Sequence, residues 1–193
     1  HMSVMLSATN SLNWISSLYG VPVEETILKA KNYFENNFVS NSTPFFLPFL
    51  SGERTPHNNP YLRGSLHMLN TSTNLDSIFY SVIEGISFGI KDGYEAVHAV
   101  SQKSKKIYLV GGGSKSEFWA DFMSSTLNDE IIVSEDSELG PALGVARLAM
   151  LATKEYKNSD IIKNMASIRN CSPSKNISDL LSERYQKWTS IIN

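Results

Sequence analysis

The chain has 193 residues, of which 41% are hydrophobic and 19% are charged, and its formal net charge at pH 7 is −2. This length and composition are typical of one globular domain with a sizeable core. Because no basic block is present, we expect no nucleic-acid partner, and no apolar run reaches the roughly 18 residues that a membrane span needs. The single cysteine, Cys171, excludes an internal disulfide and favours a reducing, cytoplasmic location.

The first 50 residues predict one strand, two helices and an extended segment. A short apolar run predicts a strand at residues 4–6. The spacing of apolar residues predicts helices over residues 10–19 and 23–33. Residues 45–50 form a dense apolar run that is interrupted by proline, so we expect an edge strand or a packed extended segment there.

Residues 51–60 read Ser-Gly-Glu-Arg-Thr-Pro-His-Asn-Asn-Pro, the composition of a long ordered loop. Loops with several charged and polar side chains are often functional. The simpler interpretation is a surface loop held by local contacts of Glu53 and Arg54, and composition alone favours it. His57 has no His, Cys or acidic partner at metal-ligand spacing, so we assign no metal to it.

The second half alternates between strand and helix patterns, which predicts an α/β domain with a partly parallel, mixed sheet between helices. Small residues along the long helix, such as Gly85 and Gly89, predict that another element packs very close to it. The predicted elements are strands at 65–69, 107–110 and 131–133, and helices at 74–100, 116–127, 141–152 and 177–192.

Three glycines, Gly111 to Gly113, follow directly after the apolar strand at residues 107–110. Glycine adopts a positive φ without strain and has no side chain, so a flat or anionic ligand can approach such a turn closely. Ser114 or Ser116 can then cap the following helix. Turns between a strand and a helix at the edge of an α/β sheet are common nucleotide sites.

Three interpretations compete for this turn. A phosphate-binding P-loop needs a Gly-Lys-Ser/Thr ending that Ser114-Lys115-Ser116 does not provide in the correct frame, so we reject it. A dinucleotide fingerprint needs a third glycine at Ser116, although Glu135 or Asp136 can mimic its ribose-binding acid. The third interpretation is a plain turn into a helix without a ligand.

Several motifs occur in one order between Val4 and about Ala152. They are the loop of residues 46–60, Arg63-Gly64, Val82-Ile83-Glu84-Gly85, Gly111-Gly112-Gly113-Ser114-Lys115-Ser116 with Trp119, and the Gly140-Pro141-Ala142-Leu143-Gly144 run. With these motifs the chain resembles the C-terminal lobe of the FGGY sugar kinases, and within them the bacterial xylulokinases. Two positions depart from the family pattern, Met68 in place of a glycine and Ser77 in place of a larger polar residue.

The resemblance implies an actin-like, ribonuclease-H-like ATPase fold that supplies the adenosine pocket of an ATP-dependent kinase. The implied nucleotide-binding residues are Gly111, Gly112, Gly113, Ser114 and Ser116, with Gly140 lining the pocket from the side. We expect a Cβ at residue 112 or 113 to project into the place of the purine ring.

The resemblance also implies that an N-terminal lobe of the same kinase carries the phosphate loop, the sugar contacts, the general base and most of the Mg²⁺ site. We therefore expect no catalytic residue and no metal ligand in this chain, which alone is inactive. The parent enzyme would transfer phosphate from ATP to a pentulose, D-xylulose. The alternatives are the same lobe of a gluconate or ribulose kinase, and a non-catalytic nucleotide-binding or interaction domain.

Two expectations concern organisation. Residues 3–153 form the adenosine-binding domain without its first strands, and residues 154–193 form a helical extension that packs on it. The predicted first strand at residues 4–6 has an unpaired edge, which favours a homodimer.

Overall fold

The computed structural model of the protein describes residues 1–102, 104, 106–135, 137–153, 161 and 167–192. The ends of the predicted helices differ from those observed by three residues at most. The helices are α1 (Ala8–Tyr19), α2 (Val23–Asn36), α3 (Leu75–His98), α4 (Glu117–Leu127), α5 (Gly140–Ala152) and α7 (Lys175–Ile192). The strands are β1 (Phe45–Leu47), β2 (Ser65–His67), β3 (Ile107–Leu109), β4 (Ile131–Ser134) and β5 (Ser167–Cys171), and two short 3-10 helices are η1 (Gly112–Lys115) and η2 (Ser137–Leu139).

The strands form two small sheets. β1 and β2 pair antiparallel, with Phe46 opposite Leu66. In the second sheet, of order β3-β4-β5, β3 runs parallel to β4 and β5 runs antiparallel to it. The predicted mixed sheet is therefore confirmed. β5 was not predicted, because its sequence Ser-Ile-Arg-Asn-Cys is largely polar and its first four residues are not buried.

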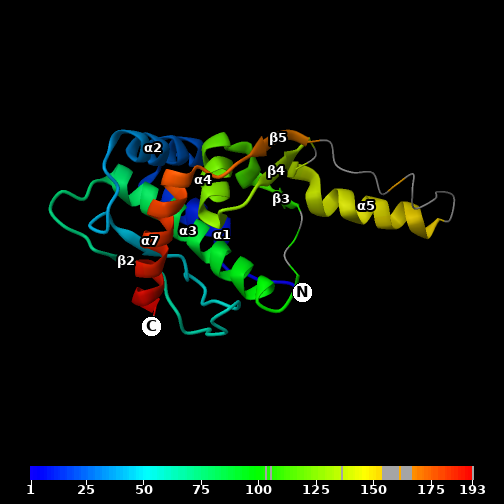
Figure 1. The fold of residues 1–193 in the computed structure, drawn as a ribbon, viewed down its shortest axis with the longest axis horizontal. Coiled ribbons are helices and arrows are strands. Elements are labelled where there is room, and N and C mark those ends of the chain that lie inside the picture. Colours follow the sequence, from blue (N-terminus) through cyan, green and yellow to red (C-terminus); the bar gives the residue numbers. More distant parts are fainter. Residues whose placement is uncertain (103, 105, 136, 154–160, 162–166, 193) are drawn as a thin grey trace.

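Helix α3 is the centre of the fold, with α1, α2, α4 and β1 packed around it (Figure 1). Its small residues allow the close packing that the sequence predicts. A Cβ on Gly85 would overlap the carbonyl oxygen of Phe46 in β1, and one on Gly89 would lie 2.6 Å from the Met5 side chain. Gly85 is therefore needed because the backbone of β1 lies directly against the helix, whereas at Gly89 the neighbour is the end of the flexible Met5 side chain.

The predicted strand at residues 4–6 is wrong. These residues form no strand, because their backbone groups bind a loop and not a neighbouring strand. The Thr55 N–H donates to the carbonyl oxygen of Val4 at 3.1 Å, and the Leu6 N–H donates to Glu53 Oε1 at 3.0 Å. The Val4 N–H donates to Thr55 Oγ1 at 3.2 Å, and one backbone–backbone bond with two side-chain acceptors does not make a ladder. This segment therefore has no strand edge through which a homodimer could form.

The C-terminal helix α7 is anchored by a buried ion pair with α3. Arg184 Nε lies 2.5 Å from Glu84 Oε1, Arg184 Nη2 lies 2.6 Å from Glu84 Oε2, and the Tyr80 hydroxyl donates to Glu84 Oε1 at 2.8 Å. Both side chains of the pair are 1% exposed. Burial lowers the pKa of Arg184, but the adjacent Glu84 carboxylate outweighs it and the pKa is raised. The guanidinium therefore stays charged.

Part of the expected C-terminal extension, residues 154–160, 162–166 and 193, lies outside the described residues. Its described helix α7 packs along α4 and β1. Trp188 in α7 is fully buried, and its indole N–H donates to the carbonyl oxygen of Phe46 at 2.9 Å.

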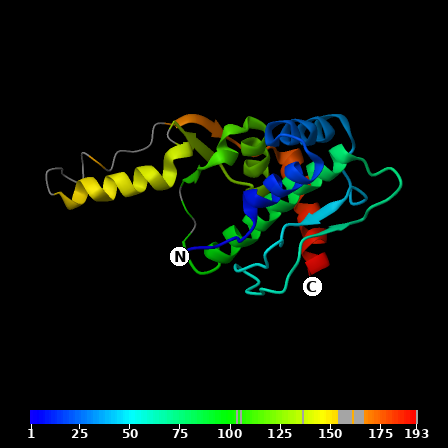
Figure 2. The ribbon, with the colours of Figure 1, turned by 180° about the vertical axis from the view of Figure 1, so that it is seen from behind.

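Helix α5 has a different position from the other helices. Figures 1 and 2 both show it extending away from the body of the domain, beyond the sheet of β3, β4 and β5.

No helix in the described residues has the length and apolarity needed to cross a membrane.

Candidate functional site

The glycine turn leads from the end of β3 into η1 and α4. Gly111 has φ +92°, a backbone conformation that side-chain-bearing residues rarely adopt. Its N–H donates to the carbonyl oxygen of Ser137 at 2.7 Å. The turn is therefore fixed to η2, the segment that follows β4 and precedes α5.

The two serines of the turn have different roles. Ser116 is the N-cap of α4, because its Oγ accepts the Trp119 N–H at 3.2 Å. Ser114 is buried, and its Oγ donates to the carbonyl oxygen of Gly111 at 2.7 Å and lies 2.9 Å from Ser137 Oγ. The predicted cap is therefore Ser116, and Ser114 stabilises the shape of the turn.

The three glycines face different surroundings. A Cβ added to Gly111 or to Gly112 would have no heavy atom within 4 Å, so both open to free space. A Cβ added to Gly113 would instead lie 3.4 Å from the Trp119 ring. A side chain at residue 113 would therefore meet Trp119, whereas the turn is open at Gly111 and Gly112. The expectation that residue 113 faces a ligand stays a prediction.

Gly140 begins α5 and lies beside the end of β3. A Cβ there would be 3.6 Å from Val110 Cβ. Since β3 and β4 are parallel, their carboxyl ends meet at one edge of the sheet. The structure thus brings the glycine turn, Ser114 and Gly140 together at that edge, which is where α/β sheets usually bind ligands.

Two cavities flank the turn. One has a volume of about 360 Å³ and lies between the turn and α2. Its apolar walls are formed by Val23, Ile27, Leu28 and Phe118. Gly112 lines the side of the cavity that the turn forms. The lining also includes Glu24, Lys31, Lys115, Ser116 and Glu117. A cavity with apolar walls beside a residue without a side chain can accommodate a flat aromatic ring.

The second cavity, of about 300 Å³, lies on the β4 and β5 side of the turn and is more polar. Arg169 on β5 lines it and pairs with two acids of α4, Glu117 at 3.2 Å and Asp121 at 2.6 Å. Glu135, one of the two acids of the dinucleotide interpretation, also lines this cavity. Asp136, the other, lies outside the described residues.

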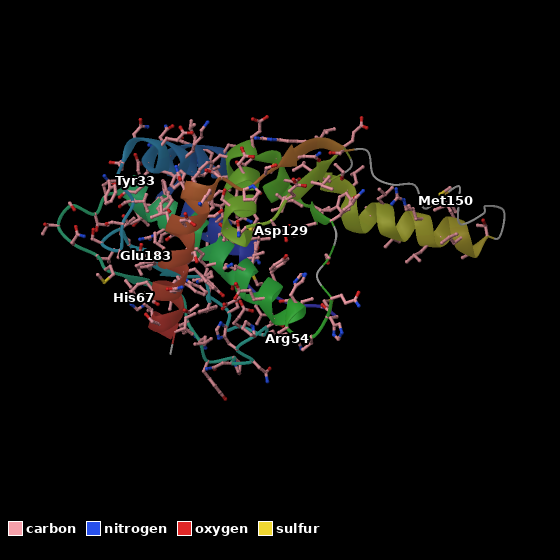
Figure 3. All side chains as sticks on the ribbon, viewed as in Figure 1. Tyr33, Arg54, His67, Asp129, Met150 and Glu183 are labelled. Carbon is pink, nitrogen blue, oxygen red and sulfur yellow. The ribbon has the colours of Figure 1, made fainter. Side chains whose placement is uncertain are left out.

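The loop of residues 51–60 is more firmly held than its sequence indicates. Glu53 is 3% exposed, and its Oε1 accepts the N–H groups of Leu6 and Arg54. The Arg54 side chain is exposed at the periphery (Figure 3). The interpretation of a loop held by contacts between Glu53 and Arg54 is therefore correct only for the Arg54 backbone.

A polar cluster, formed by His57, Asp92 and Tyr185, was missed by sequence reasoning. His57 Nε2 lies 3.0 Å from Asp92 Oδ2, and the Tyr185 hydroxyl donates to Asp92 Oδ1. Burial, followed by the bond to Asp92, raises the pKa of Tyr185, so this hydroxyl stays protonated. His57 belongs to the loop motif of residues 51–60, but Asp92 and Tyr185 are far from it in sequence, and no spacing rule connects the three residues.

Comparison with known proteins assigns the fold to a family. Residues 7–153 match the C-terminal domain of the FGGY family of carbohydrate kinases. The xylulose kinase of Escherichia coli K12 is 36% identical over 157 residues, which are 81% of this chain and 32% of that protein. The chain therefore spans about a third of the length of this relative.

Solved structures agree with this assignment. The xyloylose kinase of Brucella ovis superposes with a TM-score of 0.84 at 29% identity, over 98% of this chain and 38% of that one. A glycerol kinase of Plasmodium falciparum, solved with ADP, superposes with a TM-score of 0.76 over 97% of this chain and 37% of that one, and at 20% identity it shows the fold alone. The expected actin-like fold is thus confirmed, and the chain belongs to the FGGY family of carbohydrate kinases, as a C-terminal domain.

Proposed function

We propose that this chain is the nucleotide-binding lobe of an ATP-dependent carbohydrate kinase whose full-length form transfers the γ-phosphate of ATP to D-xylulose. The observation that carries the proposal is the open glycine turn at the joined carboxyl ends of β3 and β4. The identity to a xylulose kinase supports the choice of sugar. Because the chain spans about a third of that relative, the activity is assigned to the longer polypeptide.

In this proposal the adenosine moiety of ATP lies against the turn of Gly111, Gly112 and Gly113. The purine occupies the apolar cavity between Gly112 and α2, where a Cβ would fill the space it needs. Ser114 and Ser116 hold the turn and the start of α4 in place, and Gly140 borders the site from the other side of β3.

The N-terminal lobe of the same kinase is proposed to supply the remaining parts: the phosphate loop, the sugar contacts, the general base and most of the Mg²⁺ ligands. Phosphoryl transfer depends on positioning and charge neutralisation, and bound Mg²⁺ neutralises the phosphate oxygens. In the described residues, no three His, Cys, Asp or Glu side chains are placed to hold a metal ion. We assign no catalytic residue to this chain.

We further propose that residues 3–153 act as the adenosine-binding domain and that residues 154–193 form an extension of it. We propose that the kinase acts in the cytoplasm and that it takes part in xylose metabolism. The buried Cys171 is a free thiol, which is compatible with a reducing compartment. Burial, with a smaller effect of Asp121, raises the pKa of Cys171 to about 11, so the thiol is unreactive at neutral pH.

The proposal is tested by steady-state kinetics of the full-length kinase with ATP and a panel of sugars. We expect D-xylulose to give the highest kcat/KM. A higher kcat/KM with gluconate or ribulose would assign the domain to another kinase of the family. Binding of NAD in preference to ATP would contradict the nucleotide assignment itself.

The isolated 193-residue chain is expected to show no sugar kinase activity, because the general base and the phosphate loop are assigned to the other lobe. A coupled assay that follows ADP release with ATP and D-xylulose measures this directly. Turnover above the background without sugar would show that the chain contains a catalytic base after all.

The isolated chain is also expected to form homodimers or larger species. Among the described residues, no strand pairs with the outer edge of β3, and such an edge pairs readily with another chain. Size-exclusion chromatography with light scattering should show a mass that rises with protein concentration. A monomer mass at all concentrations up to about 100 µM, where weak association becomes visible, would contradict it.

A further inference from the structure

A further cavity lies between α2, α4 and the start of α7, elements that are neighbours in Figure 1. Its volume is about 520 Å³, compared with about 360 and 300 Å³ for the two cavities beside the glycine turn. We call it the α2–α4–α7 cavity, and its lining includes Phe34 and Glu35 on α2, Phe122 and Ser125 on α4, and Ser174 just before α7. Cavities of this volume commonly hold small organic molecules.

One wall of the cavity consists of three phenylalanine rings, those of Phe34, Phe118 and Phe122. The centroid of the Phe122 ring lies 5.5 Å from that of Phe34 and 5.8 Å from that of Phe118. Phe34 also stacks on the buried Tyr80 ring, with 5.7 Å between the centroids. The rings therefore hold one another in place, and a ligand would meet an apolar wall that is already formed.

A second wall, formed by the start of α7 and the residues before it, is also held in place. The Ser174 N–H donates to Ser125 Oγ on α4 at 3.2 Å. Ile177 in the first turn of α7 adds apolar surface. Because contacts within the domain fix both walls, the cavity does not need a ligand to form, which lowers the cost of binding one.

The charged side chains that line the cavity are mostly acidic. Glu35, Glu117 and Asp121 contribute three carboxylates, and Lys31 contributes one ammonium group. The Lys31 ammonium lies 3.8 Å from the Glu35 carboxylate. Arg169, which does not line this cavity, pairs with Glu117 and Asp121 from the side of β5. The acids still outnumber the bases, so the rim attracts a cation and repels a phosphate or a carboxylate.

Aromatic rings attract organic cations as well as apolar groups, so an aromatic wall with an acidic rim is complementary to an amine that has an apolar body. We propose that the α2–α4–α7 cavity binds a small arylalkylamine, whose ring packs on the phenylalanine wall and whose ammonium group faces Glu35 and Asp121. This site is separate from the one proposed for ATP. Lys31, Glu117 and Phe118 line both this cavity and the purine cavity, so the two ligands would be neighbours.

The test is a titration of the isotope-labelled 193-residue chain, without nucleotide, followed by the amide chemical shifts. The probes are 2-phenylethylamine, 2-phenylethanol and 3-phenylpropionate, which share a phenylethyl body and are cationic, neutral and anionic at neutral pH. We expect the amine to shift amides of residues 34–35, 121–125 and 172–177. It should bind about tenfold or more tightly than the carboxylate, with the alcohol between them.

Glu35→Lys and Glu25→Lys form the matched pair of variants. Both glutamates lie on α2 and pair with a lysine four residues away, Glu25 with Lys29 at 3.7 Å, and their side chains are similarly exposed. Of the two, Glu35 lines the cavity. We expect Glu35→Lys to raise the dissociation constant of the amine about fivefold or more, and Glu25→Lys to change it by less than about twofold.

A dissociation constant on the order of 1 mM is expected for a ligand of this size. The absence of these shifts at about 10 mM amine would overturn the proposal. Equal binding of the three probes, or equal effects of the two glutamate variants, would also overturn it. Amine binding that Gly112→Val removes and Glu35→Lys leaves intact would place the amine in the purine cavity, which overturns it as well. ATP is absent throughout, so a failure here is distinct from a failure of the nucleotide site.

Discussion

Arg184→Met is expected to lower the free energy of unfolding of the 193-residue chain by about 3–5 kcal/mol, because it leaves the Glu84 carboxylate buried without its cation. The methionine also removes the donors to the carbonyl oxygens of Ser40 and Pro44, the latter at 3.2 Å. Urea denaturation followed by circular dichroism measures the change as a shift of the midpoint with an unchanged slope.

Two further variants show how much of the lost unfolding free energy comes from the buried Glu84–Arg184 ion pair. Arg169→Met removes a partly exposed ion pair, with Asp121 Oδ2 at 2.6 Å, and should cost about 1 kcal/mol or less. Adding Glu84→Gln to Arg184→Met removes the stranded charge and should restore part of the stability. If Arg184→Met costs no more than Arg169→Met, the buried pair does not anchor α7.

Much of the fold follows from local patterns. The spacing of apolar residues predicts helix α3, and a capping box sets its start. In this box the Asn74 side chain accepts the Ser77 N–H, and Ser77 Oγ accepts the Asn74 N–H. Gly85 in the sequence indicates that another element packs close to α3, although the sequence does not identify that element as β1. These signals depend on residues near in sequence, which is why they are readable without the structure.

Other features depend on long-range pairing and were not predictable. β5 is a strand because Arg169 pairs opposite Val133, and its own sequence has no strand pattern. The apolar run at residues 4–6 has such a pattern, but the loop at Glu53 binds it instead. The partner of the buried Glu84 lies 100 residues away in Arg184. No spacing rule connects these pairs.

The candidate site was predictable in position but not in orientation. Three glycines after a buried strand, followed by Ser116 as a helix cap, locate the turn. The backbone of the turn sets the direction of each missing Cβ, and the fold sets what that Cβ would meet. A Cβ at residue 113 would meet the Trp119 ring, whereas Gly112 lines the cavity beside α2. Sequence reasoning also did not identify α2 as the opposite wall of that cavity.

Gly112→Val is expected to raise the KM for ATP of the full-length kinase at least tenfold, which corresponds to about 1.4 kcal/mol of lost binding. Gly112 has no left-handed backbone conformation, so valine adds volume without backbone strain. Its side chain would extend into the space proposed for the purine. The KM for the sugar should change little, because the sugar is assigned to the other lobe.

Gly112→Ala and Gly113→Ala form the matched pair that tests whether residue 112, and not residue 113, faces the space proposed for the purine. Both add one methyl group to the same turn, but the one at residue 113 meets the Trp119 ring at an ordinary contact distance of 3.4 Å. We expect the ATP KM to rise for Gly112→Ala, less than for valine, and to stay near the wild-type value for Gly113→Ala. If the alanine at residue 113 raises the KM for ATP and the valine at residue 112 does not, the purine does not lie in the cavity between the turn and α2.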